Sequence, residues 1–357
     1  MLKAKRLLSV LLVLVLVAAL AACAPRVETP ERPTPAQQER PAAVPAPVAE
    51  PEPKEPVEIS FPIRLAPETV EVLATEEFKR IVEERSEGRI TVNIFPGGAL
   101  GGERENIEQI QLNEVQMSNI GDLLPTLLAP TYAAPTVPFI FPDIEAVREF
   151  WNGEIGQKKR GVIEASGVTV VGLQKRLPRN LTANRPIRTV EDLAGLKLRV
   201  PDIASWIRVW TKLGTIPTPI AWAEVYMSLQ LGVVDAQENP YAEIVTAKIF
   251  EVQDYLMQTE HLTAANHWIA SKEFLDGLSP GDRELILQAV EEAIAWGDAR
   301  TAEKGSEWLQ EIKNQGMEVI EIDKEAFREA ASPAIEALSV GWAPGVKAEV
   351  DRIVGAQ

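Results

Sequence analysis

From Val57 onward the chain alternates between strand-like and helix-like stretches, and this order restricts the fold more than any other feature. Strands are expected at 58–64, 89–95, 168–173, 197–200, 233–237 and 317–322. Helices are expected at 69–84, 103–115, 203–213, 222–231, 324–338 and as one long helix within 279–315. Such alternation favours an α/β fold with mostly parallel sheets that are covered by helices on both faces. A length of 357 residues is sufficient for two lobes, each with its own core.

The first 23 residues have a different character from the rest of the chain. Basic residues at positions 3, 5 and 6 precede an almost unbroken apolar run over 7–20, and Ala21-Ala22-Cys23 follow. A charged start, an apolar stretch and small residues before a break are typical of a secretory signal. The run is shorter than the roughly 20 residues that a membrane-spanning helix needs. The end of the segment resembles a bacterial lipobox, so we expect a lipoprotein signal peptide over 1–23 with a lipidated Cys23.

The segment 24–56 is rich in proline, alanine and glutamate and lacks hydrophobic periodicity. A segment of this composition does not bury enough apolar surface to fold, and its prolines favour extended conformations. We expect a disordered stalk that holds the folded body away from the membrane. The protein is therefore expected in the periplasm or at the cell surface, anchored through Cys23.

Composition and missing motifs exclude several classes of function. The formal net charge is −16, which argues against nucleic-acid binding because that requires a basic surface. Cys23 is the only cysteine, and the two histidines, His261 and His267, are six positions apart. The chain has no phosphate-binding loop, zinc-protease motif or nucleophile elbow. We expect neither an enzyme nor a cofactor or metal site.

Polar and aromatic residues near the expected strand ends form the candidate binding site. Ligands of open α/β sheets bind at the carboxyl ends of strands. Arg199 lies at the end of one strand, Arg179 follows another, Asn239 comes just after a third, and Trp222 begins a helix. A guanidinium group binds a carboxylate through two parallel hydrogen bonds. Together these residues offer a charge clamp, an orienting amide and an apolar wall, which suit a small organic acid.

The same segments resemble the solute-binding proteins of tripartite ATP-independent periplasmic (TRAP) transporters of the DctP type. The resemblance rests on Val-Glu-Asp-Leu-Ala-Gly-Leu-Lys-Leu-Arg-Val-Pro at 190–201, Thr-Pro-Ile-Ala-Trp-Ala-Glu-Val-Tyr at 218–226, Val-Asp-Ala-Gln-Glu-Asn-Pro at 234–240 and Phe-Pro-Gly-Gly-Ala-Leu-Gly at 95–101. It extends from about Val57 to the C-terminus. Several motifs in the same order are more specific than any one of them.

The resemblance implies an α/β, two-lobed, periplasmic-binding-protein-like fold with hinge strands and a long helix that spans both lobes. The first lobe is expected to comprise 57–176 and 265–304, and the second 177–264 and 305–357. By the same resemblance Arg199 pairs with the ligand carboxylate, with help from Arg179, Asn239 and Trp222. The expected partners are a small organic acid and the small and large TRAP membrane subunits. The protein itself is expected to be a monomer.

Further candidate residues come from the first lobe and from the edges of the motifs. Sialic-acid-binding relatives carry an acidic residue where this chain has Gly121, which weakens a sialic-acid interpretation. Arg64, at the end of the first strand, is a candidate for a second ligand carboxylate, and Asp122 for a hydroxyl or ammonium group. Glu224 and His261 are additional candidates within or beside the matched motifs.

The sequence leaves the ligand open among C4-dicarboxylates, 2-oxo acids and sugar acids. One alternative is the same fold acting as a ligand sensor for a membrane receptor, and another is a site for an amino acid or amide. Neighbouring genes for TRAP membrane subunits would favour transport, and a neighbouring sensor kinase would favour signalling. An enzyme would turn its ligand over, and a purely structural surface protein would bind no small molecule.

Overall fold

The computed structural model describes residues 55–263 and 265–355. The expected signal peptide with Cys23, and the expected stalk up to residue 54, lie outside the described residues. No helix in the described ranges has the length and apolarity that crossing a membrane requires. The described residues all fall within one compact unit that spans residues 53–357.

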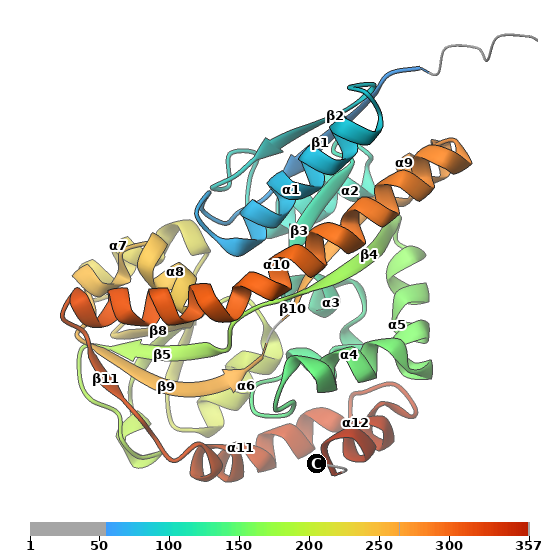
Figure 1. Cartoon of the computed structure of the whole chain (residues 1–357). Coiled ribbons are helices and arrows are strands. Elements are labelled where there is room, and N and C mark those ends of the chain that lie inside the picture. Colours follow the sequence, from blue (N-terminus) through green and yellow to red (C-terminus); the bar gives the residue numbers. More distant parts are fainter. Residues whose placement is uncertain (1–54, 264, 356–357) are drawn as a thin grey trace, which may run out of the picture. The chain divides into compact units, whose positions relative to one another are not determined.

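Two small sheets are built largely from the N-terminal half of this unit (Figure 1). β1 (Val57–Pro62) and β2 (Ile90–Phe95) pair in parallel. β10 (Ala265–Ser271) lies between β3 (Met117–Ile120) and β4 (Val168–Lys175) and is antiparallel to both. A late strand thus completes a sheet that the early part of the chain begins.

The third sheet has six strands. Its order is β11 (Glu318–Ile320), β9 (Tyr255–Leu262), β5 (Arg179–Ala183), β8 (Ala236–Asn239), β6 (Lys197–Val200) and β7 (Ile216–Pro219). β6 is parallel to β7 and β8, whereas β5 is antiparallel to β8 and β9. Parallel neighbours end at the same edge of a sheet, so β6, β7 and β8 direct their following residues toward one place.

Helices cover these sheets and connect their strands. The α-helices are α1 (Val70–Arg85), α2 (Glu103–Gln111), α3 (Leu123–Leu128), α4 (Ile144–Asn152), α5 (Glu154–Glu164), α6 (Ala204–Lys212), α7 (Val225–Gln230), α8 (Tyr241–Thr246), α9 (Lys272–Gly277), α10 (Pro280–Asn314), α11 (Lys324–Ser339) and α12 (Val346–Gly355). Short 3₁₀ turns occur at η1 (Pro130–Tyr132), η2 (Ala134–Thr136), η3 (Glu191–Leu193), η4 (Trp222–Glu224) and η5 (Ile249–Glu251).

The chain passes between the three-stranded and six-stranded sheets at two points. β4 ends at Lys175 and β5 begins at Arg179, while β9 ends at Leu262 and β10 begins at Ala265. The antiparallel pairs all involve β5 or β10, which belong to these passages. The sheets are therefore mixed rather than mostly parallel as the helix–strand alternation suggested, because the passages bring strands back in the opposite direction.

The 35-residue helix α10 packs against α1, β4 and α8 and so bridges both sheet regions (Figure 1). Ser279 caps it by accepting a hydrogen bond from the Asp282 N–H, and Pro280 occupies its first turn. A Cβ atom on Gly297 would lie 2.6 Å from Gln174 Nε2 and 3.0 Å from Ala74 Cβ. The absence of a side chain at Gly297 lets the helix approach β4 and α1 closely.

The buried apolar side chains form a core that continues across both sheet regions. The largest cluster contains Val168 of β4 as well as Leu181 of β5 and Leu198 of β6. A second cluster lies between α1, α10 and the two small sheets, where Phe61, Phe78 and Trp268 pack edge to face or at a tilt. α12 packs on α4, so the end of the described chain lies against a helix from the first half of the unit.

Candidate functional site

A cavity of about 1000 Å³ opens where the ends of β6, β7 and β8 face the loops that follow β1, β2 and β3. Its polar lining contains Arg64, Glu103, Arg104, Glu105, Asp122, Arg176, Arg179, Arg199, Asp202, Asn239, Thr246 and Glu243, and its aromatic lining contains Trp206 and Trp222. The cavity thus combines several arginines with several carboxylates, and the pairing among them determines which charge is left for a ligand.

Among the described residues, Arg199 is the arginine of this lining without an acidic partner. It lies on β6, is only 4% exposed, and donates from Nε and Nη2 to the Ile220 carbonyl oxygen at 2.9 and 2.7 Å. Within the described ranges no carboxylate lies within ion-pair distance of its guanidinium group. Burial lowers its pKa to about 9, although the more distant Glu238 counteracts this effect. A buried cation of this kind needs an anion to compensate its lost hydration.

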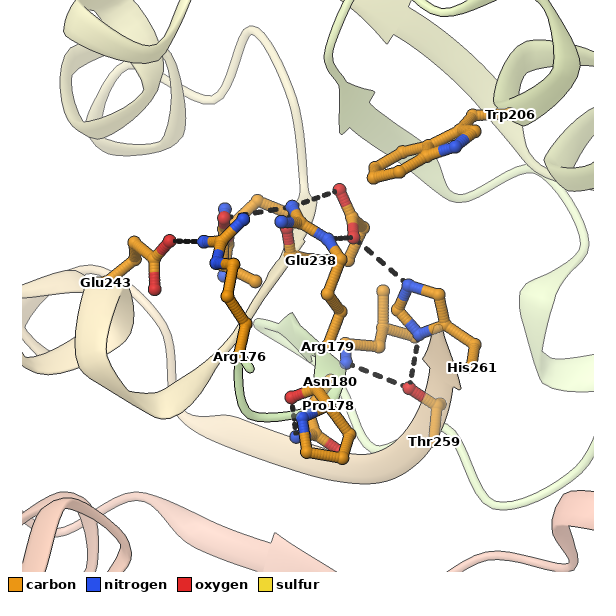
Figure 2. A network of polar contacts seen from close by, with 12 residues as sticks. Arg176, Pro178, Arg179, Asn180, Trp206, Glu238, Glu243, Thr259 and His261 are labelled. Atoms are coloured by element: carbon orange, nitrogen blue, oxygen red, sulfur yellow. Dashed lines mark hydrogen bonds and ion pairs between the residues drawn. The ribbon is translucent and has the colours of Figure 1, made fainter. Parts of the chain in front are cut away.

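Arg179, at the start of β5, is already neutralised by the protein (Figure 2). Its Nε and Nη2 groups contact the two carboxylate oxygens of Glu238 at 2.5 and 2.9 Å. Nη2 also donates to Asn239 Oδ1 at 2.9 Å, and the guanidinium group lies 4.9 Å from the centre of the Trp206 ring. Arg179 can still present its remaining edge to the cavity, but it brings no net charge with it.

Two buried hydrogen bonds behind Arg179, both made by His261, hold Glu238 in place. His261 Nε2 lies 3.0 Å from Glu238 Oε2, and His261 Nδ1 lies 2.8 Å from Thr259 Oγ1 (Figure 2). Burial alone would raise the pKa of Glu238, but Arg179 and His261 together lower it to about 2. Burial lowers the pKa of His261, and Glu238 only partly opposes the shift. Glu238 is therefore a fixed negative charge that orients Arg179.

Asn239 and Trp222 lie beside Arg199 and Arg179, the two arginines of the six-stranded sheet. The Asn239 side chain is buried at the end of β8, where Oδ1 accepts from Arg179 and Nδ2 donates to Gln237 Oε1 at 2.6 Å. Trp222 begins η4 and has a partly buried ring that is 5.9 Å from the Arg199 guanidinium carbon. The same ring is 5.6 Å from the guanidinium carbon of Arg64.

Arg64 belongs to a second group of paired charges at the opposite side of the cavity. Its Nε lies 3.1 Å from Glu103 and its Nη2 lies 3.6 Å from Glu243, while its buried Nη1 makes no hydrogen bond in the described part of the chain. Arg176 pairs with Glu243 and lies 3.4 Å from Glu71. Burial would raise the pKa of Glu103, but Arg64, the Gly121 N–H and Arg176 lower it.

Gly121 lies in close contact with the paired charges at this side of the cavity. Its N–H donates to Glu103 Oε1 at 2.8 Å. A Cβ atom there would lie 3.1 Å from the same oxygen and 3.4 Å from Arg176 Nη1. A larger side chain would displace the pairing of Glu103 with its neighbours.

Asp122 lies between the large cavity and a small one of about 10 Å³ that Lys159 and His267 also line. Burial raises the pKa of Asp122 to about 6, against the effect of Arg176 and Arg179. Burial also lowers the pKa of Lys159 to about 7, although Asp122 opposes the shift. Asp122 thus offers a carboxyl group that changes its protonation state near neutral pH.

The structure brings most of the expected site residues together at one cavity. Arg199, Arg179, Asn239, Trp222, Arg64 and Asp122 all line it. Glu224 is exposed and does not line it. His261 is buried behind Glu238, and His267 faces the small cavity.

Other residues of the cavity did not emerge from the sequence. Arg176 and Trp206 each lie within a few residues of an expected site residue, which was the available signal. Glu103 begins an expected helix, and Glu243 follows Asn239 by one helical turn. Nothing in the sequence distinguishes these two glutamates from the many others, because their role depends on distant arginines.

The chain is similar to known solute-binding proteins. The model of the DctP family, described as bacterial extracellular solute-binding protein, family 7, matches residues 62–339. The chain belongs to this family. The family resemblance noted in the sequence is thereby confirmed.

Relatives and solved structures agree with this assignment. The solute-binding protein RD1_1052 of Roseobacter denitrificans is 37% identical over 74% of this chain and 81% of its own length. Its crystal structure with bound L-galactonate matches with a TM-score of 0.78 at 33% identity, covering 84% of this chain and 99% of that one. The C4-dicarboxylate-binding periplasmic protein DctP of Rhodobacter capsulatus is 30% identical over 78% of this chain and 85% of its own length. The sugar-acid-binding protein DctPAm of Advenella mimigardefordensis, in complex with galactonate, matches with a TM-score of 0.80 at 27% identity, over 85% and 99% of the two chains.

These findings confirm the two-lobed α/β fold of a TRAP periplasmic solute-binding protein. The protein is therefore an extracytoplasmic binding protein that works with the membrane subunits of a TRAP transporter, and it is not an enzyme.

Proposed function

We propose that the protein binds a sugar acid with a single carboxylate and delivers it to its TRAP membrane subunits. The observation that carries this proposal is the buried Arg199 guanidinium group, whose only hydrogen-bond partner among the described residues is the Ile220 carbonyl oxygen. A ligand carboxylate would compensate this charge through the free edge of the group. Because water is largely excluded there, the pair is stronger than one at the surface.

The pairing of the other cavity arginines supports one carboxylate rather than two. Arg179 is neutralised by Glu238, and Arg64 and Arg176 share Glu103, Glu243 and Glu71. A second ligand carboxylate would have to displace one of these glutamates or lie beside it. Arg64, expected as a candidate for a second carboxylate, is on this view a donor to a neutral part of the ligand.

The remaining polar groups suit the hydroxyls of a sugar acid. Asp122 and Asn239 offer acceptors, Arg64 Nη1 offers an unused donor, and Trp222 offers a flat surface for the carbon chain. Two structural relatives were solved with galactonate, a polyhydroxy acid with one carboxylate. The relative from R. capsulatus is named for C4-dicarboxylates, which makes that class the main rival in a binding test.

The first prediction concerns Arg199 itself. Arg199→Ala should weaken galactonate binding by about 2 to 5 kcal/mol, because the ligand carboxylate loses its partner in a buried site. Arg199→Lys should also lose much of the affinity, since an ammonium group cannot form the two parallel hydrogen bonds. Titration calorimetry on protein that has been unfolded and refolded, to remove carried ligand, measures both. Wild-type affinity in Arg199→Ala would contradict the proposal.

The refolded protein should be screened by thermal shift against sugar acids, C4-dicarboxylates and 2-oxo acids. A ligand present at 100 times its dissociation constant stabilises the native state by about 2.7 kcal/mol, which gives a clear shift. We expect the largest shift with galactonate or a related monocarboxylate. A larger shift with a C4-dicarboxylate would contradict the choice of ligand class and leave the transport role in place.

We also propose that Cys23 carries a lipid anchor, that 24–56 forms a stalk and that the mature protein is a monomer. Support comes from the apolar run before Ala21-Ala22-Cys23 and from the proline-rich composition after it. Cys23→Ala should move the protein from the detergent phase to the aqueous phase in a phase-partition assay of whole cells. Unchanged partition would exclude lipidation as the anchor.

The lobe boundaries stay as expected from the sequence and are part of this proposal. The first lobe would comprise 57–176 and 265–304, and the second 177–264 and 305–357. The two points where the chain passes between the sheets, after β4 and after β9, support this division. Contacts made across the cavity in the closed state would drive closure on the ligand.

A further inference from the structure

We propose that Glu243 determines the preference for a single carboxylate by occupying the arginines at the far side of the cavity. This inference rests on the proposed function, since it assumes that Arg199 holds the first carboxylate. Glu243 lies in the first turn of α8, four residues after Asn239, and is only 2% exposed. It lines the cavity and is not among the residues expected from the sequence.

The contacts of Glu243 show which cations it occupies. Its Oε1 atom pairs with Arg176 Nη2 and lies 3.6 Å from Arg64 Nη2 (Figure 2 shows the pair with Arg176). Arg64 comes from the end of β1 and Arg176 from the passage after β4, so one carboxylate joins two segments that are distant in sequence. Each guanidinium group has a second acidic neighbour, which is Glu103 for Arg64 and Glu71 for Arg176.

Arg64 lies where the distal end of a ligand would reach. Its guanidinium carbon is 5.6 Å from the centre of the Trp222 ring, and that of Arg199 is 5.9 Å from the same centre. An acid that is held by Arg199 and extends along this indole therefore brings its other end to Arg64. Arg64 Nη1 is buried and makes no hydrogen bond in the described part of the chain, so a donor is available there.

The charge of Glu243 decides which distal group Arg64 can accept. A hydroxyl or carbonyl oxygen can take the unused hydrogen of Nη1 while Glu243 stays in place. A second ligand carboxylate would lie close to Glu243 in a buried site, and like charges repel strongly where water is excluded. Glu71 already experiences such repulsion. Burial raises the pKa of Glu71, and the negative charge of Glu243 raises it further, although Arg176 lowers it.

The substitution Glu243→Gln keeps the size of the side chain and removes its charge. The test compares galactonate with galactarate, which has the same six-carbon hydroxy chain and a carboxylate at both ends. We expect the ratio of the galactarate affinity to the galactonate affinity to rise about tenfold or more in Glu243→Gln, measured by titration calorimetry on refolded protein. An unchanged ratio would overturn the inference.

Two controls separate this effect from a general one. Glu251→Gln removes one negative charge from an exposed position that pairs with Lys248, and it should leave the ratio at the wild-type value. The double variant Arg64→Gln with Glu243→Gln should lose the gain for galactarate, because the inference assigns that gain to Arg64. A gain that persists without Arg64, or that appears in Glu251→Gln, would overturn the assignment.

The same titrations distinguish failure of this inference from failure of the proposed function. Arg199→Ala should weaken both acids, whatever the role of Glu243. Wild-type protein that prefers galactarate would contradict the proposed monocarboxylate ligand. A wild-type preference for galactonate that survives unchanged in Glu243→Gln would contradict only the role of Glu243. If Glu243→Gln does not refold, Glu103→Gln tests the same mechanism from the other carboxylate on Arg64, and an unchanged ratio there would also overturn the inference.

Discussion

At the scale of single residues, the site depends on which charges have partners inside the protein. The sequence proposed Arg199 as the carboxylate partner and Arg179 as a helper. Among the described residues, Arg179 is paired with Glu238, whereas Arg199 donates only to a carbonyl oxygen. A ligand carboxylate therefore binds best at Arg199, because it replaces the hydration that this buried guanidinium group has lost. Asp122 and Lys159 add two buried groups whose pKa values, about 6 and about 7, lie near neutral pH.

Asp122 should make ligand binding depend on pH. A ligand hydroxyl that donates to the carboxylate favours its charged form. Below its pKa of about 6, binding must first remove a proton, so affinity should fall by up to about tenfold per pH unit. Galactonate titrations between pH 5 and pH 8 should show this trend in wild type and a much weaker trend in Asp122→Asn. An equal trend in both would show that another group is responsible.

Lys159 should make stability rise with pH. Its side chain is 1% exposed, packs on Trp151, and has a pKa of about 7 that rises to about 10.5 in the unfolded chain. Between these values the unfolded state binds more protons, so the free energy of unfolding increases with pH. From pH 7 to pH 9 wild type should gain about 2 kcal/mol relative to Lys159→Met in urea unfolding.

The neighbouring Lys158 is a matched control for this experiment. It is half exposed and pairs with Glu154 one helical turn away. Lys158→Met should show no gain of wild-type stability between pH 7 and pH 9. A similar gain for both lysines would mean that the burial of Lys159 is not its cause.

At the scale of elements, the long helix and the two passages between sheets decide how the site residues meet. α10 packs along α1, β4 and α8, and Gly297 lets it approach Gln174 and Ala74 closely. β6, β7 and β8 end at one edge and present Arg199, Ile220 and Asn239 to the cavity. The loops after β1, β2 and β3 face them and contribute Arg64, Glu103 and Asp122.

Gly297→Ala should destabilise the protein although alanine is the better helix former. The added methyl group would lie 2.6 Å from Gln174 Nε2 and 3.0 Å from Ala74 Cβ, so overpacking outweighs propensity and we expect a net loss of about 1 to 2 kcal/mol. Gly161 in α5 is exposed and has no neighbour within 4 Å of such a methyl group. Gly161→Ala should raise stability by about 0.5 to 1 kcal/mol in the same urea unfolding experiment. Stabilisation by both substitutions would show that α10 is not tightly packed against β4 and α1 at Gly297.

At the scale of the whole described unit, one apolar core continues across both sheet regions. The largest cluster joins Val168 and Leu173 of β4 to Leu181 and Leu198 of the six-stranded sheet. A shared core and a helix that packs on both regions favour a single cooperative unfolding transition. The family assignment adds that this unit is a two-lobed binding protein of a transporter.

Ligand binding should therefore stabilise the unit as a whole. Galactonate at 100 times its dissociation constant should raise the free energy of unfolding by about 2.7 kcal/mol. Tryptophan fluorescence and far-ultraviolet circular dichroism should report the same transition, with and without ligand. Two separate transitions, of which ligand shifts only one, would show that the two sheet regions unfold independently.

The sequence determined the family and some of the elements, because both depend on local patterns, but strands such as β3, β5, β7, β9 and β10 were not expected. Hydrophobic periodicity placed α1, β2, β6 and α11 close to their observed bounds, and the motif at 190–201 identified Arg199. Periodicity also suggested mostly parallel sheets, which was wrong for β5 and β10. Strand direction depends on where the chain returns between the sheets, and no local pattern records that.

Only the tertiary structure decided which charges in the cavity are free. Arg64 and Glu243 are far apart in sequence, as are Arg176 and Glu71, and each pair forms through the passages between sheets and the packing of α8. Ion pairing is set by distances of a few ångströms between side chains from different elements. The sequence could therefore propose a carboxylate site at Arg199, and the folded chain alone determined that Arg64 is already occupied.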